Sequence, residues 1–184
     1  VRACEICEVA GSGMIMSGGD RRRLRPGGHS AVNNHIHHFS RRILTNEPGL
    51  RLEGVANRAA HNLIHDAPHM AIGFGGNENT IEYNEIHSVV YESNDAGAIY
   101  SGRDWTQRGN LVRYNYLHDI IGFGWENGKW TSPHFNWGVY LDDGTCGVRV
   151  HHNLIVRTIL GGVHYHGGRD NIVENNILID GRDS

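Results

Sequence analysis

The sequence predicts an all-β fold, a parallel β-helix of about six coils in which the chain winds as a solenoid. Two short patterns carry this prediction, because they alternate six times along the 184 residues. The first is a small residue followed by an apolar-x-apolar alternation: GMIMSG from 13, GLRLEG from 49, AIGFGG from 71, GAIYSG from 97, GVYLDD from 138 and GVHYHG from 162. The second is apolar-x-x-Asn-x-(Ile or Leu), with its asparagines at Asn34, Asn62, Asn84, Asn115, Asn153 and Asn176.

The spacing of these patterns favours a solenoid over other repeat folds. Successive strand patterns are separated by as few as 22 residues, from position 50 to position 72. That length holds several short strands but not the four strands of a propeller blade, and the spacing of a leucine-rich repeat is missing. Each coil should therefore pair with the coils above and below at about 4.8 Å, with the longer spacings forming loops. The repeated asparagines should form a hydrogen-bonded ladder, because buried amides need partners.

Composition sets further limits. The formal charge is -3 and no apolar run approaches the roughly 20 residues that span a bilayer, so we expect neither a nucleic-acid partner nor a membrane span. Cys4 and Cys7 form a single C-x-x-C without a second half, and Cys146 is alone, so no metal or cofactor is expected. The chain reads as one domain, 1–184, that begins at Val1 without a signal peptide. We expect it to be a segment of a longer protein, lacking its caps.

Alternation along the strands assigns the two faces. The residues expected to point inward are Met14/Met16, Leu50/Leu52, Ile72/Phe74, Ala98/Tyr100, Val139/Leu141 and Val163/Tyr165. One outward column then runs Ile15, Arg51, Gly73, Ile99, Tyr140, His164, and the next runs Ser17, Glu53, Gly75, Ser101, Asp142, His166. The register after that is glycine in five coils of six, with Asp143 as the exception. Aspartate tolerates the left-handed backbone that a glycine column suggests, so Asp143 has a conformational explanation.

Asp142 has no such explanation, and it is the first candidate for a catalytic residue. An acid on the preceding coil, offset by a residue or two, would lie about 5 to 9 Å away, which covers both glycosidase arrangements. Asp104 and Asp142 are the leading pair, followed by Asp143, and by Asp95 if its loop folds back. One carboxyl group would be the acid and the other the base or nucleophile.

A groove with sugar-binding side chains is predicted around these acids. Gly73 and Gly75 should leave a floor without side chains, and the long segment 119–138 should bring Trp125, Trp130 and Trp137 above the strand end that carries Asp142. The candidate substrate-binding residues are Arg103, Tyr140, His164, His166, Trp105, Trp137 and Glu53. Four histidines that follow the asparagine pattern, His37, His65, His87 and His118, should form a surface stripe that belongs to the repeat.

Several segments carry a family resemblance, above all NDAGAIYSGRDWT and YLDDG, together with NLIHDAPHMAIGFGGNENTIEYNEIH and GRDNIVENNILID. They resemble the central right-handed β-helix of secreted bacterial carbohydrate-active proteins, similar to the β-helical glycoside hydrolases that include α-L-fucosidases and xylanases. The resemblance implies a polysaccharide- or oligosaccharide-processing enzyme that uses two groove aspartates, among Asp95, Asp104, Asp142 and Asp143. It also implies a secreted or periplasmic location. Missing cap segments, or self-association through the solenoid ends, would cover the apolar end coils.

Two other classes of function stay open. A polysaccharide lyase or epimerase acting on uronate polymers would use an arginine or lysine base and an acidic groove lined with calcium, and Arg51, Arg103 and Glu53 keep this class open. The groove lacks the repeated acids that calcium would require in such an enzyme. A non-catalytic glycan-binding or structural solenoid would show repetitive outward columns, whereas these columns change composition sharply from coil to coil.

Overall fold

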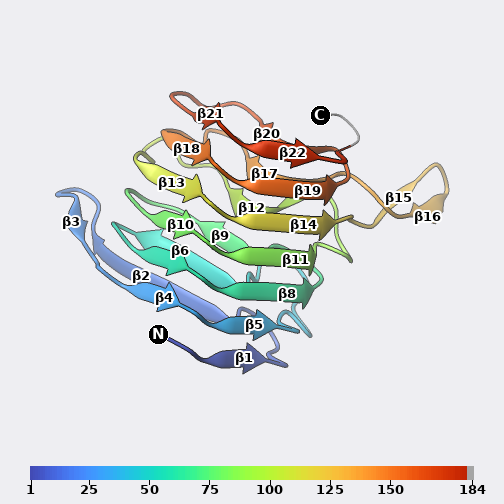
Figure 1. Ribbon diagram of the computed structural model, residues 1–184, viewed down its shortest axis with the longest axis horizontal. Coiled ribbons are helices and arrows are strands. Elements are labelled where there is room, and N and C mark those ends of the chain that lie inside the picture. Colours follow the sequence, from blue (N-terminus) through green and yellow to red (C-terminus); the bar gives the residue numbers. More distant parts are fainter. Residues whose placement is uncertain (182–184) are drawn as a thin grey trace.

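The computed structural model describes residues 1–181, and within them it confirms a parallel β-helix of about six coils (Figure 1). Each coil contributes one strand to each of three parallel sheets, which we call the first, second and third sheets in the order in which the chain passes from β2 onward. The described residues contain no helix that is long and apolar enough to cross a membrane.

The three sheets follow the coils in register. The first sheet contains β2 (Met14–Asp20), β6 (Leu50–Gly54), β9 (Ile72–Phe74), β12 (Ala96–Ser101), β17 (Asn136–Leu141) and β20 (Gly161–Tyr165), with β3 (Arg25–Pro26) antiparallel at its edge. The second contains β4 (Ser30–Val32), β7 (Arg58–Ala60), β10 (Thr80–Glu82), β13 (Asn110–Arg113), β18 (Val148–His151) and β21 (Ile172–Glu174). The third contains β1 (Glu5–Cys7), β5 (His35–His37), β8 (Leu63–Ala67), β11 (Glu85–Val89), β14 (Tyr116–Ile120), β19 (Leu154–Thr158) and β22 (Ile177–Ile179).

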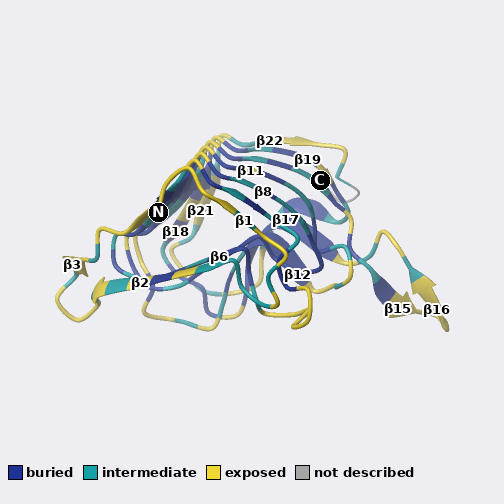
Figure 2. Ribbon diagram, turned by 90° about the horizontal axis from the view of Figure 1, so that it is seen from below, coloured by how far each residue is buried: buried dark blue, intermediate teal, exposed yellow. Residues whose placement is uncertain are grey.

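The core is a set of apolar columns that run through the coils. In the third sheet one column pairs Ile36, Ile64, Ile86, Leu117 and Ile155 directly across neighbouring strands, and each of these side chains is at most 1% exposed. Burying one such side chain contributes about 1.5 to 3 kcal/mol. Exposed residues lie instead in the loops, in one projecting hairpin and in β1 and β22, strands of the two end coils (Figure 2). The repeated strand pattern of the sequence therefore corresponds to a continuous apolar core.

The asparagine ladder is confirmed at the corner between the second and third sheets. The Nδ2 group of each asparagine donates to the Oδ1 atom of the next one along the axis, at 2.8 to 2.9 Å, from Asn34 to Asn176. The residue before each asparagine has a φ of 53 to 56°, and these residues are Asn33, His61, Tyr83, Tyr114, His152 and Asn175. The corner thus depends on a left-handed residue that is never glycine, a feature that the sequence reading missed.

A second asparagine ladder was also missed. It lies at the corner between the first and second sheets, where the backbone N–H of Asn57 donates to Asn79 Oδ1 and that of Asn79 donates to Asn110 Oδ1. Asn171 makes the corresponding contact with the N–H of Val148. Each of these four asparagines precedes a ladder asparagine by five residues, so the spacing N-x4-N was the available signal.

The histidine stripe is confirmed on the outward face of the third sheet. We define it as His37, His65, His87 and His118, whose rings stack in that order with centroids 4.7 to 5.2 Å apart. The residue after each of these histidines again has a positive φ. This backbone turn brings the following side chain against the histidine Nδ1 atom in all four coils.

The predicted register of the fourth strand in the first sheet was wrong by one residue. Tyr100 pairs with Gly73 and Tyr140, so it belongs to the outward column, whereas Ile99 pairs with Ile72 and Val139 and is fully buried in the core. Ser101, expected to face outward, is buried and bonded through its hydroxyl group to Gln107 at 3.1 Å. A branched apolar side chain fills the core better than a tyrosine, whose hydroxyl group needs a polar partner.

The long segment before β17 also differs from expectation. It forms an antiparallel hairpin, β15 (Gly124–Glu126) with β16 (Lys129–Thr131), that projects from the solenoid and carries the exposed Trp125 and Trp130 (Figure 1). The hairpin joins β14 to the start of β17, whereas Asp142 follows the last residue of β17. These two tryptophans therefore do not lie above the strand end that carries Asp142.

Candidate functional site

A hollow lies on the outward face of the first sheet, over β6, β9 and β12. Three of its lining residues are glycines, Gly73, Gly75 and Gly102, and their missing side chains leave room for it. Its lining residues are Arg51, Glu53, Gly73, Phe74, Gly75, Tyr100, Ser101, Gly102, Asp104 and Gln107. A Cβ atom on Gly75 would lie 2.6 Å from Glu53 Oε2, and one on Gly102 would lie 2.9 Å from the Tyr100 hydroxyl oxygen. The sequence prediction that Gly73 and Gly75 form an open floor agrees with this geometry.

Glu53 is one of two carboxyl groups that line the hollow. It comes from β6, and its side chain lies over Gly75 with Arg51 Nη1 3.9 Å from its carboxylate. Burial raises the pKa of Glu53, and the nearby negative charge of Asp104 adds to the effect, while Arg51 and Arg21 oppose it. Glu53 was expected as a substrate-binding residue, or as part of a lyase groove, and not as a residue of the hydrolase pair. Its environment favours the protonated carboxyl group more than water does.

Asp104 is the other carboxyl group of the hollow, and its environment favours the ionised form. Arg21 Nη2 lies 2.8 Å from its carboxylate, and the Thr106 hydroxyl group donates to it at 2.6 Å. Burial tends to raise the pKa of Asp104, but the hydrogen bonds from Thr106 and Arg21 outweigh it and the pKa is lowered. Arg21 reaches this site from the first coil, and its place in a run of arginines gave no sign of that contact.

Asp142 follows the outward register but is covered rather than open. Its carboxylate accepts a hydrogen bond from the Tyr100 hydroxyl group at 2.6 Å and contacts His166 Nδ1 at 3.0 Å, and the residue is only 7% exposed. Burial would raise the pKa of Asp142, but the hydrogen bonds from Tyr100, His166 and Tyr140 lower it to about 2. Asp142 therefore stays ionised and fixes the Tyr100 ring at the edge of the hollow.

Asp143 and Arg103 lie at the surface beside this group. The Asp143 side chain is more than half exposed, 3.4 Å from His166 Nδ1 and 3.9 Å from Arg103 Nε. The conformational explanation for Asp143 was wrong, because Asp143 has no positive φ; Gly144 does, at 70°. Asp142, Asp143 and His166 each offer a ligand atom within 4.8 Å of the others, so this group could hold a cation.

Trp137, Tyr140 and His164 form an aromatic wall along β17 and β20. Trp137 stacks on His164 with ring centroids 4.1 Å apart and is 7% exposed, so its face is covered by the imidazole ring. The Tyr140 hydroxyl group donates to Asp95 at 3.3 Å, so the loop of Asp95 does fold back against this wall. Trp105 is 62% exposed and lies against Gly144, where a Cβ atom would meet its ring at 2.9 Å.

The predicted residues thus divide into two groups. Glu53 and Asp104 line the hollow, together with Tyr100 and Gln107, which the sequence reading did not single out. Asp142, Asp143, Tyr140, His164 and His166 form an adjoining polar row that is joined to the hollow through the bond from Tyr100 to Asp142. The misread register of the fourth strand hid Tyr100, since it placed that ring in the core.

Stacked parallel coils, inner apolar columns and an asparagine ladder define a β-helical solenoid with a polar hollow on one sheet. A family model described as a right-handed beta helix region matches residues 1–178, and the chain belongs to that family. The expected right-handed parallel β-helix is therefore confirmed. Neither the curated proteins nor the solved structures gave a match.

Proposed function

We propose that the chain is a glycoside hydrolase that cleaves a polysaccharide or oligosaccharide in the hollow of the first sheet. The observation that carries this proposal is a pair of carboxyl groups, Glu53 and Asp104, that line one hollow and have pKa values shifted in opposite directions. Glycosidases need one carboxyl group that holds a proton and one that is ionised, and the two pKa shifts favour these two states.

In this mechanism Glu53 donates its proton to the glycosidic oxygen as the bond to the anomeric carbon breaks. Asp104 is the ionised partner, and it either takes a proton from the attacking water or attacks the anomeric carbon itself. The Arg21 guanidinium group holds Asp104 in its ionised form. This assignment keeps one member of the leading pair, Asp104, and replaces Asp142 by Glu53 as its partner.

Asp142 has a positioning role in this proposal. Because it is ionised and accepts the Tyr100 hydroxyl proton, it orients the ring that borders the hollow. Arg51 and Gln107 offer hydrogen-bond donors to sugar hydroxyl groups within the same lining. A polysaccharide is too large to enter a cell intact, so we further propose that the enzyme acts in a secreted or periplasmic setting.

The test is hydrolysis by the purified protein on neutral glycans and on uronate polymers, followed as new reducing ends. We expect Glu53→Gln and Asp104→Asn each to lower kcat/KM by about 10² to 10⁴, the usual contribution of general acid–base catalysis. Glu78→Gln is the matched control, because Glu78 is an exposed carboxylate outside the hollow lining. The pH profile should lose its alkaline limb in Glu53→Gln, since that limb reports the proton on Glu53.

Three outcomes would reject the proposal. Unsaturated products from uronate polymers would indicate a lyase, for which the group of Asp142, Asp143 and His166 offers a cation site. Turnover that is unchanged in both hollow variants would remove the catalytic assignment. Tight binding of a glycan without any turnover would indicate a non-catalytic solenoid instead.

A further inference from the structure

The first strand of the third sheet carries metal-ligating side chains that the hollow does not use. Glu5 and Cys7 are two residues apart on β1, so they share its outward face. They pair directly with His35 and His37 of β5. Four ligating side chains therefore form a compact block across two neighbouring strands.

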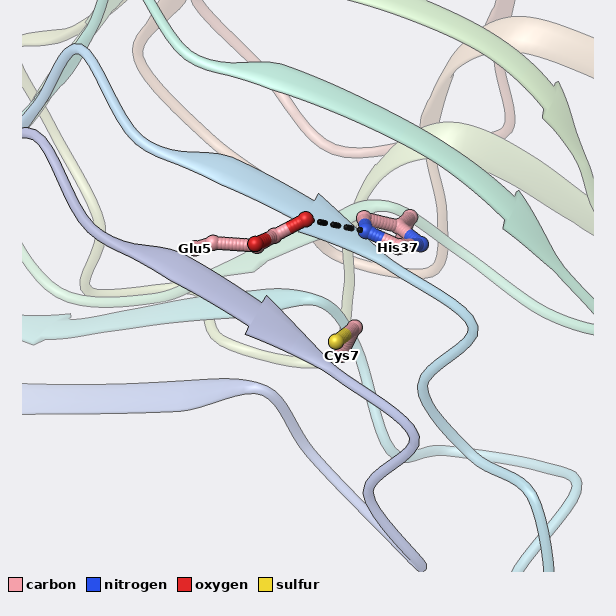
Figure 3. A group of neighbouring side chains, drawn as sticks. All are labelled: Glu5, Cys7 and His37. Carbon is pink, nitrogen blue, oxygen red and sulfur yellow. Dashed lines mark hydrogen bonds and ion pairs between the residues drawn. The ribbon is translucent and has the colours of Figure 1, made fainter.

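Three of these side chains converge. The ligand atoms of Glu5, Cys7 and His37 all lie within 4.8 Å of one another, and Glu5 Oε1 is 3.3 Å from His37 Nε2. Figure 3 shows the carboxylate and the thiol approaching the imidazole ring from the side of β1. Tetrahedral zinc with bonds of about 2.0 to 2.3 Å holds its ligand atoms about 3.3 to 3.7 Å apart, so small side-chain rotations suffice to close the site.

The neighbours of His37 orient it for this role. Its Nδ1 atom lies 2.7 Å from Nδ1 of His38, a residue with a φ of 49° that turns its side chain back onto His37. A hydrogen bond at Nδ1 leaves the Nε2 lone pair directed at the ligand group, as in many metal sites. His35 Nδ1 lies 3.8 Å from the same Glu5 oxygen and offers a fourth ligand.

A similar group on the same sheet is less suited to a metal ion. Glu85, His87 and His118 also lie within 4.8 Å of one another, but they include no sulfur. The rings of His87 and His118 stack at 4.8 Å with an angle of 19°, so their in-plane lone pairs run nearly parallel and do not meet. Carboxylate, imidazole and thiolate together form a set that zinc prefers over calcium or magnesium.

We propose that Glu5, Cys7 and His37 bind a zinc-class divalent transition ion that ties β1 to β5. The single C-x-x-C of the sequence did not indicate a site, because its partner ligand comes from the next coil. Cys4, the other cysteine of that motif, stands apart, with its thiol directed at the Arg2 carbonyl oxygen at 3.4 Å. The ion would reinforce a strand whose pairing with β5 consists of three residue pairs.

The test uses the whole chain, reduced and freed of metal, titrated with Zn²⁺ and with Co²⁺. We expect one equivalent of Co²⁺ to give the charge-transfer absorption of a thiolate complex, and Cys7→Ser to lose that absorption. Glu5→Gln and His37→Asn should each weaken Zn²⁺ binding by about 10-fold or more. Cys4→Ser and His87→Asn are the matched controls, and both should bind as the parent chain does.

Three results would overturn the proposal: no thiolate absorption with the parent chain, an absorption that survives in Cys7→Ser, or an equal loss of Zn²⁺ affinity in His87→Asn and His37→Asn. Thermal unfolding in a chelator gives the second readout. All variants should unfold at the temperature of the parent chain there, and added Zn²⁺ should raise that temperature only where Glu5, Cys7 and His37 are intact.

Discussion

The outward faces of the third and first sheets are built from the same coils, but the third sheet repeats one side chain from coil to coil and the first sheet does not. On the third sheet one position reads His37, His65, His87 and His118 in consecutive coils, and the rings stack. On the first sheet the corresponding position reads Arg51, Gly73, Tyr100, Tyr140 and His164. A repeated side chain can stack on its copy in the next coil. Side chains that vary from coil to coil instead open a hollow and place carboxyl groups in different environments. The comparison separates residues that stabilise the stacked coils from residues that the coils present at the surface for function.

The largest expected effect is on the repetitive side, in the asparagine ladder. Asn84→Ala would leave the Asn62 amide and the Ala59 carbonyl oxygen without their buried partners, so we expect the free energy of unfolding to fall by roughly 3 to 5 kcal/mol. Denaturant unfolding followed by circular dichroism measures this loss. Asn176→Ala is the control, because Asn176 is only half-buried and water can replace its bonds. Equal losses at the two positions would contradict the ladder as a buried network.

The next effect concerns His69, in the connection from the third sheet to the first. Burial lowers the pKa of His69 to about 4, and its Nδ1 atom has no partner among the described residues. The unfolded chain therefore binds a proton more readily, so the stability that is present above pH 6.5 falls as the pH drops toward 4, by roughly 3 kcal/mol. Unfolding at several pH values checks this slope. His69→Gln should flatten it, and an unchanged slope in that variant would refute the assignment.

A smaller effect on stability, but a clear one on activity, is expected at Gly75 in the hollow. The added methyl group of Gly75→Ala meets the end of the flexible Glu53 side chain, which can move aside, so stability should change by less than about 1 kcal/mol. The displaced Glu53 should lower kcat/KM on the substrate by about 10-fold or more. Gly73→Ala is the control, because its nearest contacts are at 3.3 Å or beyond and do not include Glu53. Equal activity in the two variants would argue against Glu53 as the acid.

The smallest effect is expected at an exposed ion pair beside the histidine stripe. Asp119 contacts Arg157 at 2.6 Å and His118 at 2.7 Å, and the hydrogen bond from Arg157 lowers the pKa of Asp119. Its contribution is present above the usual aspartate pKa and is lost as the pH falls through the lowered one. Because the pair is screened by water, Asp119→Asn should cost no more than about 1 kcal/mol, and less at high salt. A loss that does not vary with salt would indicate a packing effect.

The sequence predicted the repetitive features well, for a physical reason. A ladder asparagine occupies one register in six coils, so six copies of the signal support one another. The left-handed residues that precede the asparagines of the first ladder escaped prediction because they are asparagine, histidine or tyrosine rather than glycine.

The hollow could be predicted only in part. GAIYSG fits two registers. Aligning its glycine with the other coils placed Tyr100 inward, whereas in the folded chain Ile99 pairs with Ile72 and is the buried residue. Arg21 meets Asp104 across 83 positions of sequence, and no local pattern encodes that contact. Residues that occur once in a repeat have no second copy to correct a misalignment.

Hairpin β15–β16 is an insertion that lengthens one coil of the solenoid. Tyr100 still pairs with Tyr140, and Tyr140 with His164, although one connecting segment is far longer than the other. An insertion at this corner does not shift the strand pairing on either side of it. The length of a coil therefore does not determine the register of its strands. A 22-residue coil could thus be duplicated, or a new hairpin inserted, without changing which residues pair in the other coils. Evolution and protein engineering can both extend the fold in this way.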